Sequence, residues 1–256
     1  MQVAALGRSA ACVLILPVGL VLVSAWAVLL ASLHAPRRRL DRVITGFARF
    51  AAWLGGTRLE VHGLERIQPG CGYVIVLNHE SNWDPVVLFA ALQRLSLRGA
   101  FKKEIMRIPF FGRGLLLTGF VVVDRSDTRA DIDRLQRGMA QRPADVSVVF
   151  YAEGHRSRDG ALQPFKKGAF VTAITYGLPV MPVGTAGSRR LWPPGTLRVR
   201  SGPAVVEVGA PLPVTGLTLT DRDRLCADAF TAVRECRARA RARLRALGFE
   251  PGGIDA

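Results

Sequence analysis

The sequence predicts an α/β domain with a largely parallel central sheet flanked by helices, and an N-terminal membrane-anchoring helix or helical hairpin precedes this domain. From about residue 55 onward, short apolar runs typical of buried strands alternate with helical stretches. Such alternation is typical of domains that are built around a parallel sheet. Ahead of them, residues 9–36 contain no Asp, Glu, Lys or Arg, and this composition predicts the anchor.

The anchor is expected over Ala10–Leu33. At ~1.5 Å per residue, a helix of this length crosses a hydrocarbon core of ~30 Å. Four arginines lie between residues 37 and 42, whereas only Arg8 precedes the apolar stretch. The positive-inside rule therefore predicts a protein of the cell membrane whose α/β domain lies on the cytoplasmic face.

Two other interpretations of this stretch remain open. Pro17 and Gly19 can break the helix into a re-entrant hairpin that enters only one leaflet. A cleaved signal peptide is the second, although the apolar region is longer than the ~7–15 residues of a typical signal-peptide core.

The next elements are predicted from periodicity and from turn residues. An amphipathic helix is expected over Arg38–Leu54, where apolar residues recur at helical spacing ahead of Gly55-Gly56. The candidate strands are Tyr73–Leu77, Phe120–Val123, Ser147–Phe150 and Val180–Val183. The candidate helices are Pro85–Arg94, Ala130–Met139 and Gly168–Tyr176.

The C-terminal part is predicted to be a β-hairpin followed by a long helix. Leu197–Arg200 and Ala204–Val208 would pair across a Ser-Gly-Pro turn. Thr220 and Asp223 form a capping-box pattern, after which an apolar stripe and an arginine-rich face alternate at helical spacing. The predicted units are an anchor with a basic amphipathic helix (1–54), an α/β domain (55–219) and a C-terminal basic amphipathic helix with a tail (220–256).

Composition limits the classes of partner. The chain has 256 residues, 49% of them hydrophobic, and a net charge of +15. This charge indicates an anionic partner, which can be a nucleic acid, an acidic lipid surface or a phosphorylated substrate. A nucleic acid as the partner would leave the apolar N-terminal stretch unexplained. The sequence also lacks the interleaving of basic and aromatic residues that is typical of nucleic-acid binding.

The 4 cysteines are scattered without CxxC spacing, which indicates neither a zinc site nor a disulfide framework and favours a reduced, cytosol-facing domain.

The first polar cluster, Asn78–Asp84, follows the apolar run Tyr73–Leu77, and Pro85 suits the start of a helix. His79 and Asp84 are five residues apart, so they meet only if His79 lies in the turn and Asp84 at the start of the helix. A histidine held by a carboxylate is a general-base pair. The alternative is that Asp84 is only an N-cap and His79 an ordinary polar residue.

The second cluster, Tyr151–Ser157, also follows an apolar strand. Gly154 would let backbone amides approach a phosphate, and Arg156 would supply a bidentate donor for it. Glu153 would orient that arginine or bind a substrate hydroxyl. A third strand ends in Asp124-Arg125, where Arg125 would bind phosphate or pair with its neighbour. Taken alone, each of these turns could also be a surface turn with an ion pair.

The lysines occur only as two pairs, Lys102-Lys103 and Lys166-Lys167, each after a phenylalanine. In a chain that otherwise uses arginine, this suggests that both places require an ammonium group, although chance clustering explains the pairs equally well. Other catalytic patterns are missing from the sequence, including the G-x-S-x-G elbow, the Walker A motif and histidines at metal-ligand spacing.

Together and in this order, the blocks resemble the glycerolipid acyltransferase family, most closely the bacterial 1-acyl-glycerol-3-phosphate (lysophosphatidic acid) acyltransferases. The family's N-H-x-x-x-x-D block is matched by Asn78, His79 and Asp84, and its G-x-x-x-x-D-R strand is matched by residues 119–125. Its F-P-E-G-T-R-S block is matched at Glu153, Gly154, Arg156 and Ser157. Its apolar proline block is matched at Pro179 and Pro182. The resemblance covers about residues 55–215. The chain departs from the third block, with Tyr151-Ala152 for Phe-Pro and His155 for Thr.

The resemblance implies the glycerolipid acyltransferase fold and acyl transfer from acyl-CoA or acyl-carrier protein to a glycerolipid hydroxyl. His79 would take the proton of the hydroxyl while Asp84 holds His79. The substrate-binding residues would be Lys102, Arg125 and Arg156, which clamp the acceptor phosphate, with Glu153 and Gly154 beside them. No metal or cofactor is implied. The expected partners are a lysophospholipid acceptor, the acyl donor and an anionic membrane surface, without nucleic acid.

Two alternatives stay open. The acceptor could be another lyso-lipid, such as a lyso-ornithine lipid. A non-catalytic membrane lipid-binding protein is the other, but such a protein need not keep both His79 and Asp84.

Overall fold

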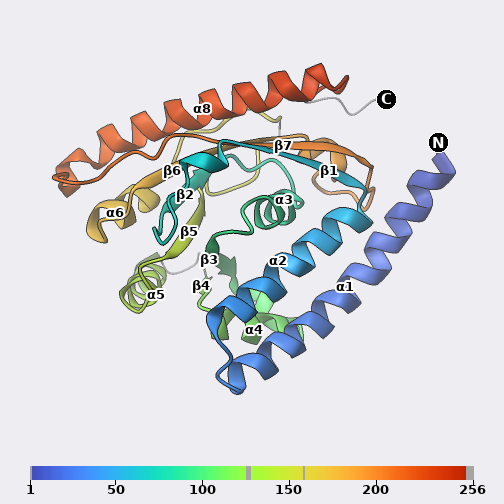
Figure 1. The fold of residues 1–256 in the computed structure, drawn as a ribbon, viewed down its shortest axis with the longest axis horizontal. Helices are drawn as coiled ribbons and strands as arrows, with labels where there is room; N and C mark the ends of the chain where they lie inside the picture. Colours follow the sequence, from blue (N-terminus) through green and yellow to red (C-terminus); the bar gives the residue numbers. More distant parts are fainter. Residues whose placement is uncertain (1, 125–127, 158, 252–256) are drawn as a thin grey trace.

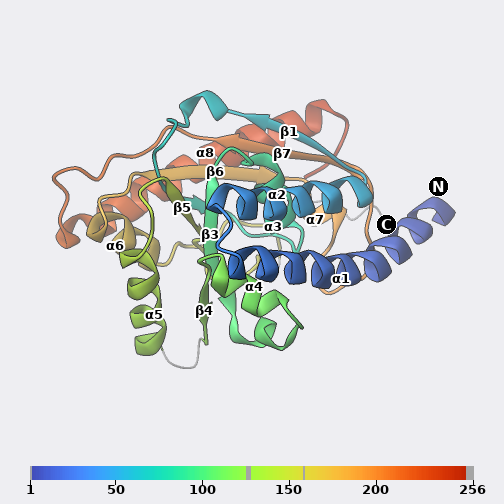
Figure 2. The ribbon, with the colours of Figure 1, turned by 60° about the horizontal axis from the view of Figure 1, so that its bottom comes forward.

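A seven-stranded sheet runs through the middle of the protein, and helices cover both of its faces (Figures 1 and 2). The computed structural model describes residues 2–124, 128–157 and 159–251. The strands are β1 (Thr57–His62), β2 (Val74–Leu77), β3 (Ser96–Lys102), β4 (Val121–Val123), β5 (Val146–Tyr151), β6 (Val180–Ala186) and β7 (Gly202–Val208).

The helices differ widely in length. The α-helices are α1 (Gln2–Ser32), α2 (Arg37–Leu54), α3 (Asp84–Ala91), α4 (Phe111–Leu117), α5 (Thr128–Ala140), α6 (Gly168–Thr175), α7 (Ser188–Leu191) and α8 (Arg222–Ala246). Short 3-10 helices are η1 (Leu64–Arg66), η2 (Lys103–Arg107) and η3 (Leu219–Asp221).

The sheet is largely parallel, as the sequence predicts. Its strand order is β1-β7-β6-β2-β5-β3-β4. Each neighbouring pair is parallel except β6 and β7, which are antiparallel. The carboxyl ends of β6, β2, β5, β3 and β4 therefore share one edge of the sheet. Ligands of open α/β sheets bind at such an edge, where connections leave a central strand in both directions.

Two hydrophobic cores lie on opposite faces of the sheet because side chains alternate along each strand. In β2, Ile75 and Leu77 pack with α2 and α3 on one face, whereas Val74 and Val76 pack with α6 and α8 on the other. A strand that is buried on both faces is apolar throughout, and this explains why the run at residues 73–77 is so clear in the sequence.

The predicted helices and most predicted strands are confirmed, with bounds that differ by a few residues. The sequence analysis missed β1 and β3. In β3 the pattern is interrupted by Arg98, which is buried and has an ion pair with Asp41 of α2 at 2.8 Å. The capping box lies at Thr218 and Asp221, two residues before the predicted one.

The predicted hairpin is wrong. Residues 197–200 form no strand, and Gly202–Val208 pairs with β1 on one side and β6 on the other. The partner strand β1 lies far away in the sequence, so the local turn signal at Ser201-Gly202-Pro203 does not mark a pair of adjacent strands.

The N-terminal helix α1 runs unbroken through Pro17 and Gly19, so the break that one interpretation placed there is not present. After a turn, α2 returns beside α1 (Figures 1 and 2). Contacts extend along α1: the Ser9 side chain hydrogen-bonds the backbone of Val199, and Ser24 lies against Gly114 of α4. The helix therefore lies along the domain rather than projecting from it.

Helix α8 packs so closely on β6 that there is no room for a side chain at Gly184. A methyl group added at Gly184 would lie 2.2 Å from the backbone nitrogen of Arg237 and 2.4 Å from the carbonyl carbon of Cys236. Gly184→Ala should therefore force α8 away from the sheet and lower the free energy of unfolding by about 1–3 kcal/mol. Chemical denaturation followed by circular dichroism measures this.

Gly168→Ala is the matched control, because nothing lies within 4 Å of the methyl group that it adds. Its free energy of unfolding should change by no more than about 0.5 kcal/mol. Equal stability of the two variants would contradict the close approach of α8 to β6.

Candidate active site

Three turns meet at the carboxyl edge of the sheet. The first, Asn78–Asp84, follows β2 and is called the His79 turn below. The second is the loop Ala152–Gln163 after β5, called the post-β5 loop. The third is the short link from β6 to α7, which begins at Gly187 and continues into Ser188. Because β2 lies between β5 and β6, side chains from all three turns can reach one another.

His79 and Asp84 contact each other as their spacing requires. Nδ1 of His79 lies 2.7 Å from Oδ2 of Asp84, with His79 in the turn and Asp84 as the first residue of α3. Asp84 is fully buried, whereas the His79 side chain is 19% exposed. The N-cap alternative does not hold, since Trp83 occupies that position and no side chain caps the helix.

Further donors fix the Asp84 carboxylate in place. Oδ2 accepts the backbone N–H groups of Glu80 at 2.7 Å and Ser81 at 2.8 Å, and Oδ1 accepts the hydroxyl of Ser188. The carboxylate thereby sets the orientation of the imidazole. Because Nδ1 is bound to Asp84, Nε2 is the ring nitrogen that can accept a proton from a substrate.

Tyr151 packs against the imidazole. The two rings are stacked, with centroids 4.1 Å apart and planes inclined by 29°. The Tyr151 hydroxyl is buried and has no hydrogen-bond partner among the described residues. Burial raises the pKa of Tyr151 well above its ordinary value, so the phenol stays neutral at physiological pH. In the sequence, Tyr151 is only the first residue of the second cluster and a departure from the family pattern.

Glu153 supports the backbone of the site. Its Oε1 accepts the backbone N–H of His79 at 2.7 Å, and Oε2 accepts that of Gln163 at 2.9 Å. Burial raises the pKa of Glu153, and these backbone hydrogen bonds oppose the rise. The carboxylate therefore connects the His79 turn to the far end of the post-β5 loop, a contact that neither of the roles expected from the sequence describes.

Gly154 and Arg156 lie in the same loop. Gly154 has φ +76°, a conformation that favours glycine, and a Cβ there would lie 2.6 Å from Cε of Lys166. The ammonium of Lys166 thus lies over the glycine. Arg156 is exposed and donates a hydrogen bond to the Asn82 side chain, which joins the two predicted clusters.

The two remaining predicted residues are placed differently. Lys102 ends β3, two strands away from β2 on the same edge, and its side chain is exposed. Arg125 lies outside the described residues.

In each lysine pair, one member forms an ion pair with an aspartate: Lys103 with Asp124 at 2.8 Å and Lys167 with Asp223 at 2.9 Å. The other members, Lys102 and Lys166, are exposed.

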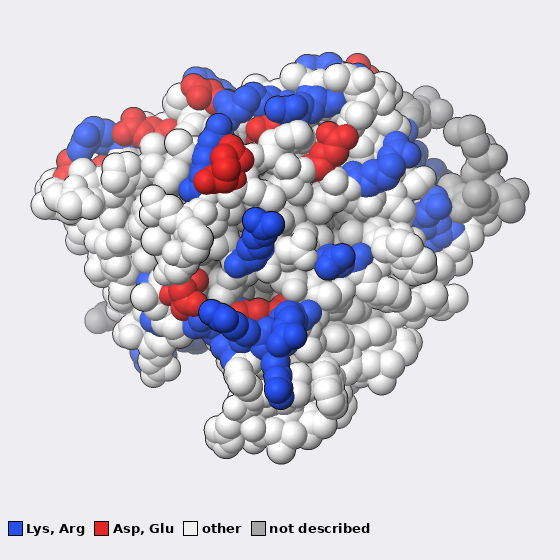
Figure 3. Space-filling model, in the orientation of Figure 1, with Lys and Arg blue, Asp and Glu red and all other residues white. Residues whose placement is uncertain are grey.

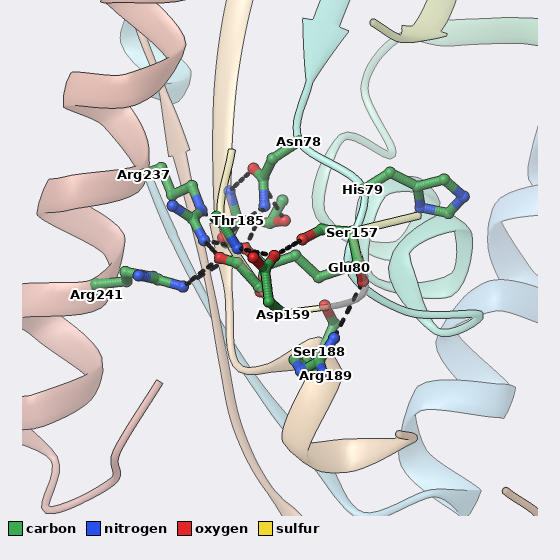
Figure 4. A network of polar contacts seen from close by, with 12 residues as sticks. Asn78, His79, Glu80, Ser157, Asp159, Thr185, Ser188, Arg189, Arg237 and Arg241 are labelled. Atoms are coloured by element: carbon green, nitrogen blue, oxygen red, sulfur yellow. Dashed lines mark hydrogen bonds and ion pairs between the residues drawn. The ribbon is translucent and has the colours of Figure 1, made fainter. Parts of the chain in front are cut away.

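Sequence reasoning missed a polar network behind the His79 turn (Figure 4). Glu80 is buried and accepts hydrogen bonds from Asn78 at 3.1 Å and from Nε of Arg237 at 2.7 Å. The sequence did contain one signal of this network. Arg237 is four residues after Val233, so it lies beside the apolar stripe of α8. An arginine at such a position requires a buried acceptor. No comparable signal marked Ser188.

The arrangement has the parts that acyl transfer to a hydroxyl requires. A histidine oriented by a buried carboxylate can accept the proton of a hydroxyl. Two basic groups lie near the same turns: Arg156 bonds Asn82 of the His79 turn, and Lys166 lies over Gly154. Such groups can hold an anionic part of a substrate. Within the described residues, no group of three or more His, Cys, Asp or Glu side chains is placed to hold a metal ion.

Comparison with known proteins identifies the family. Residues 58–186 match the family model described as Acyltransferase. A 1-acyl-sn-glycerol-3-phosphate acyltransferase from Pseudomonas aeruginosa is 34% identical over 182 residues, which cover 66% of this chain and 69% of that protein. The human 1-acyl-sn-glycerol-3-phosphate acyltransferase alpha is 31% identical over 189 residues, which cover 72% and 66%.

A solved structure shows the same fold. The crystal structure of the 1-acyl-sn-glycerophosphate (LPA) acyltransferase PlsC from Thermotoga maritima matches with a TM-score of 0.74 and 22% identity, and the match covers 93% of this chain and 97% of that one. The resemblance seen in the sequence is thereby confirmed, and this chain belongs to the acyltransferase family.

Proposed function

We propose that this acyltransferase moves a fatty acyl group from acyl-CoA or acyl-carrier protein to the free hydroxyl of 1-acyl-glycerol-3-phosphate, giving phosphatidic acid. The observation that carries the proposal is the His79–Asp84 pair at 2.7 Å, whose turn is joined to Arg156 of the post-β5 loop by a hydrogen bond to Asn82. The names of the relatives from Pseudomonas aeruginosa and human support the choice of acceptor.

The proposed reaction is a direct transfer. Nε2 of His79 takes the proton from the acceptor hydroxyl as its oxygen attacks the thioester carbonyl. The C–O bond forms, the C–S bond breaks, and the imidazolium returns the proton to the leaving thiolate. Asp84 stabilises the imidazolium between these steps, as the carboxylate of a catalytic triad does. This route requires neither a metal nor a covalent enzyme intermediate.

The acceptor phosphate is proposed to bind at the post-β5 loop. The guanidinium of Arg156 and the backbone turn at Gly154 would hold it, together with Lys102 and Arg125, the further cations that the family resemblance implies. Lys166, which lies over Gly154, supplies a further cation at this place. Binding the phosphate here would set the hydroxyl beside His79, and such positioning lowers the barrier to the reaction.

We also propose that the protein is bound to the membrane through α1, with the catalytic domain on the cytoplasmic face. The described part of the chain contains 1 helix that is long and apolar enough to cross a membrane, Leu6–Ser32. Large apolar side chains of α1 face outward, among them Leu14 at 69% and Leu22 at 66% exposed. Since α1 lies along the domain, membrane binding would bring the whole domain to the lipid surface.

His79→Ala should lower acyl transfer by a factor of ~10²–10⁴, because the variant loses its general base. The assay measures transfer from acyl-CoA and from acyl-carrier protein to lysophosphatidic acid. His62→Ala, on β1, is the matched control and should retain normal turnover. Near-normal turnover of the His79 variant would rule out the general-base role.

Arg156→Lys should weaken use of the acceptor while leaving donor binding unchanged, since an ammonium cannot reproduce the bidentate contact of a guanidinium with phosphate. Loss of one charge-assisted contact is worth ~1.5–3 kcal/mol, or roughly one to two powers of ten in acceptor kcat/KM. The measurement varies lysophosphatidic acid at fixed donor, and then donor at fixed acceptor.

Asn82→Ala is the control for this variant, because it removes the hydrogen bond of Arg156 to Asn82 but keeps the guanidinium. An equal loss in both variants would mean that Arg156 only holds the loop. An equal loss with an uncharged lyso-acceptor would favour a different lyso-lipid as the substrate, such as a lyso-ornithine lipid.

Replacing both Leu14 and Leu22 with Asp should release the protein from lipid vesicles. Removing two large apolar side chains from a lipid interface costs at least about 3 kcal/mol, or roughly a hundredfold in partitioning. Flotation with vesicles that contain anionic lipid measures it. Leu219→Asp, on η3 away from α1, is the control and should float like the wild type. Release of the wild-type protein by salt alone would contradict anchoring through α1.

A further inference from the structure

The C-terminal helix α8 reaches the active site through one buried arginine. The Arg237 side chain is 10% exposed, and its Nε and Nη2 each lie 2.7 Å from Oε1 of Glu80, the residue after His79. Nη2 also donates to the backbone carbonyl of Gly160 in the post-β5 loop. One guanidinium therefore holds both turns that form the site (Figure 4).

Neighbouring contacts make this connection stiff. Arg241, one turn further along α8, donates to the same Gly160 carbonyl at 2.9 Å. Within the site, the backbone N–H of Ser157 donates to the carbonyl of His79 at 2.8 Å. Asn78 connects Glu80 to β6, since its amide bonds the carboxylate at 3.1 Å and the backbone of Thr185.

Electrostatics explain why the partner is an arginine. Burial raises the pKa of Glu80, while the charge of Arg237 and its hydrogen bond to Glu80 oppose this rise. The nearby Asp84 adds to the rise because a second negative charge is unfavourable there. Arg237 thus compensates a carboxylate beside the catalytic pair, and its planar group reaches two acceptors at once.

In Figure 4 the Glu80 side chain points from the turn toward α8, whereas His79 points the other way. We propose that Arg237 is a positioning residue: it holds the His79 turn, through Glu80, at a set distance from the post-β5 loop, through the Gly160 carbonyl. His79 and Arg156 lie on these two segments. The inference deepens the proposed function and rests on it, because that distance would determine where the acceptor hydroxyl lies relative to the general base.

The test separates positioning from simple charge compensation. Arg237→Met leaves the buried Glu80 without its partner at 2.7 Å and with only the more distant Arg241, at 3.9 Å, as a cation among the described residues, so it should lower both the melting temperature and kcat. In the double variant Glu80→Gln/Arg237→Met no uncompensated charge remains, and the melting temperature should recover. Arg241 still bonds Gly160 at 2.9 Å, but in the wild type it lies 3.9 Å from Glu80, so the close bridge between the His79 turn and Gly160 is still lost. We therefore expect kcat to stay low, since a misplacement of about 1 Å can cost roughly a hundredfold. Recovery of kcat together with the melting temperature would overturn the proposal.

A conservative variant and a matched control sharpen the result. Arg237→Lys keeps the charge but cannot span both acceptors, so it should keep most of the melting temperature and lose much of kcat. Arg243→Met removes another α8 arginine that pairs with a buried sheet carboxylate, Glu207 of β7. It should leave kcat unchanged. An equal fall of kcat in Arg243→Met would show that any loosening of α8 suffices, which would overturn the specific role of Arg237.

A readout that needs no turnover keeps this proposal separate from the proposed function. Among the 4 histidines of the chain, the His79 ring signals can be followed by nitrogen-15 NMR. Arg237→Met and the double variant should both shift them, and Arg243→Met should not. Unshifted signals in the double variant would overturn positioning. Shifted signals with no transfer to lysophosphatidic acid by the wild type would mean that positioning holds and the proposed acceptor is wrong.

Discussion

The geometry of the site depends on the carboxylate of Asp84. It is fully buried, and it accepts hydrogen bonds from the His79 ring, from two backbone N–H groups of the turn and from the Ser188 hydroxyl. These donors come from the end of β2 and from the segment after β6, so one side chain joins two adjacent strands to α3. A buried carboxylate is stable only when it has such partners. The contacts that stabilise the fold here therefore also orient the imidazole.

The contact between His79 and Asp84 could be predicted from the sequence because its geometry is local. His79 and Asp84 are five residues apart, and a strand followed by a turn and a helix leaves them one way to meet. The helices and the strands buried on both faces could be predicted for a similar reason, since their periodicity is complete within one segment. The same holds for Gly154, whose place in a turn is confirmed by its positive φ.

Features that depend on distant partners could not be predicted. The ion pair of Arg237 and Glu80 joins residues 157 positions apart, and an arginine in an arginine-rich helix is ordinarily assigned to the solvated face. The strand β3 was missed because Arg98 interrupts its apolar pattern, and only the position of Asp41 on α2 explains that burial. Basic residues lie along α8 at the top of Figure 3 and in a second group below the centre of that face, and the sequence could not show that they share one side of the molecule.

The position of Arg237 on α8, the last described helix of the chain, also has a consequence for the order of events during synthesis. A chain is made from its N-terminus, so α1 is the first described helix to leave the ribosome and α8 the last. The face of β6 at Gly184 stays uncovered, and Glu80 lacks its cation, until α8 emerges. Under the proposed attachment through α1, a nascent chain would reach the lipid surface long before the His79 turn is held in place. Attachment would then come first, and a complete site last.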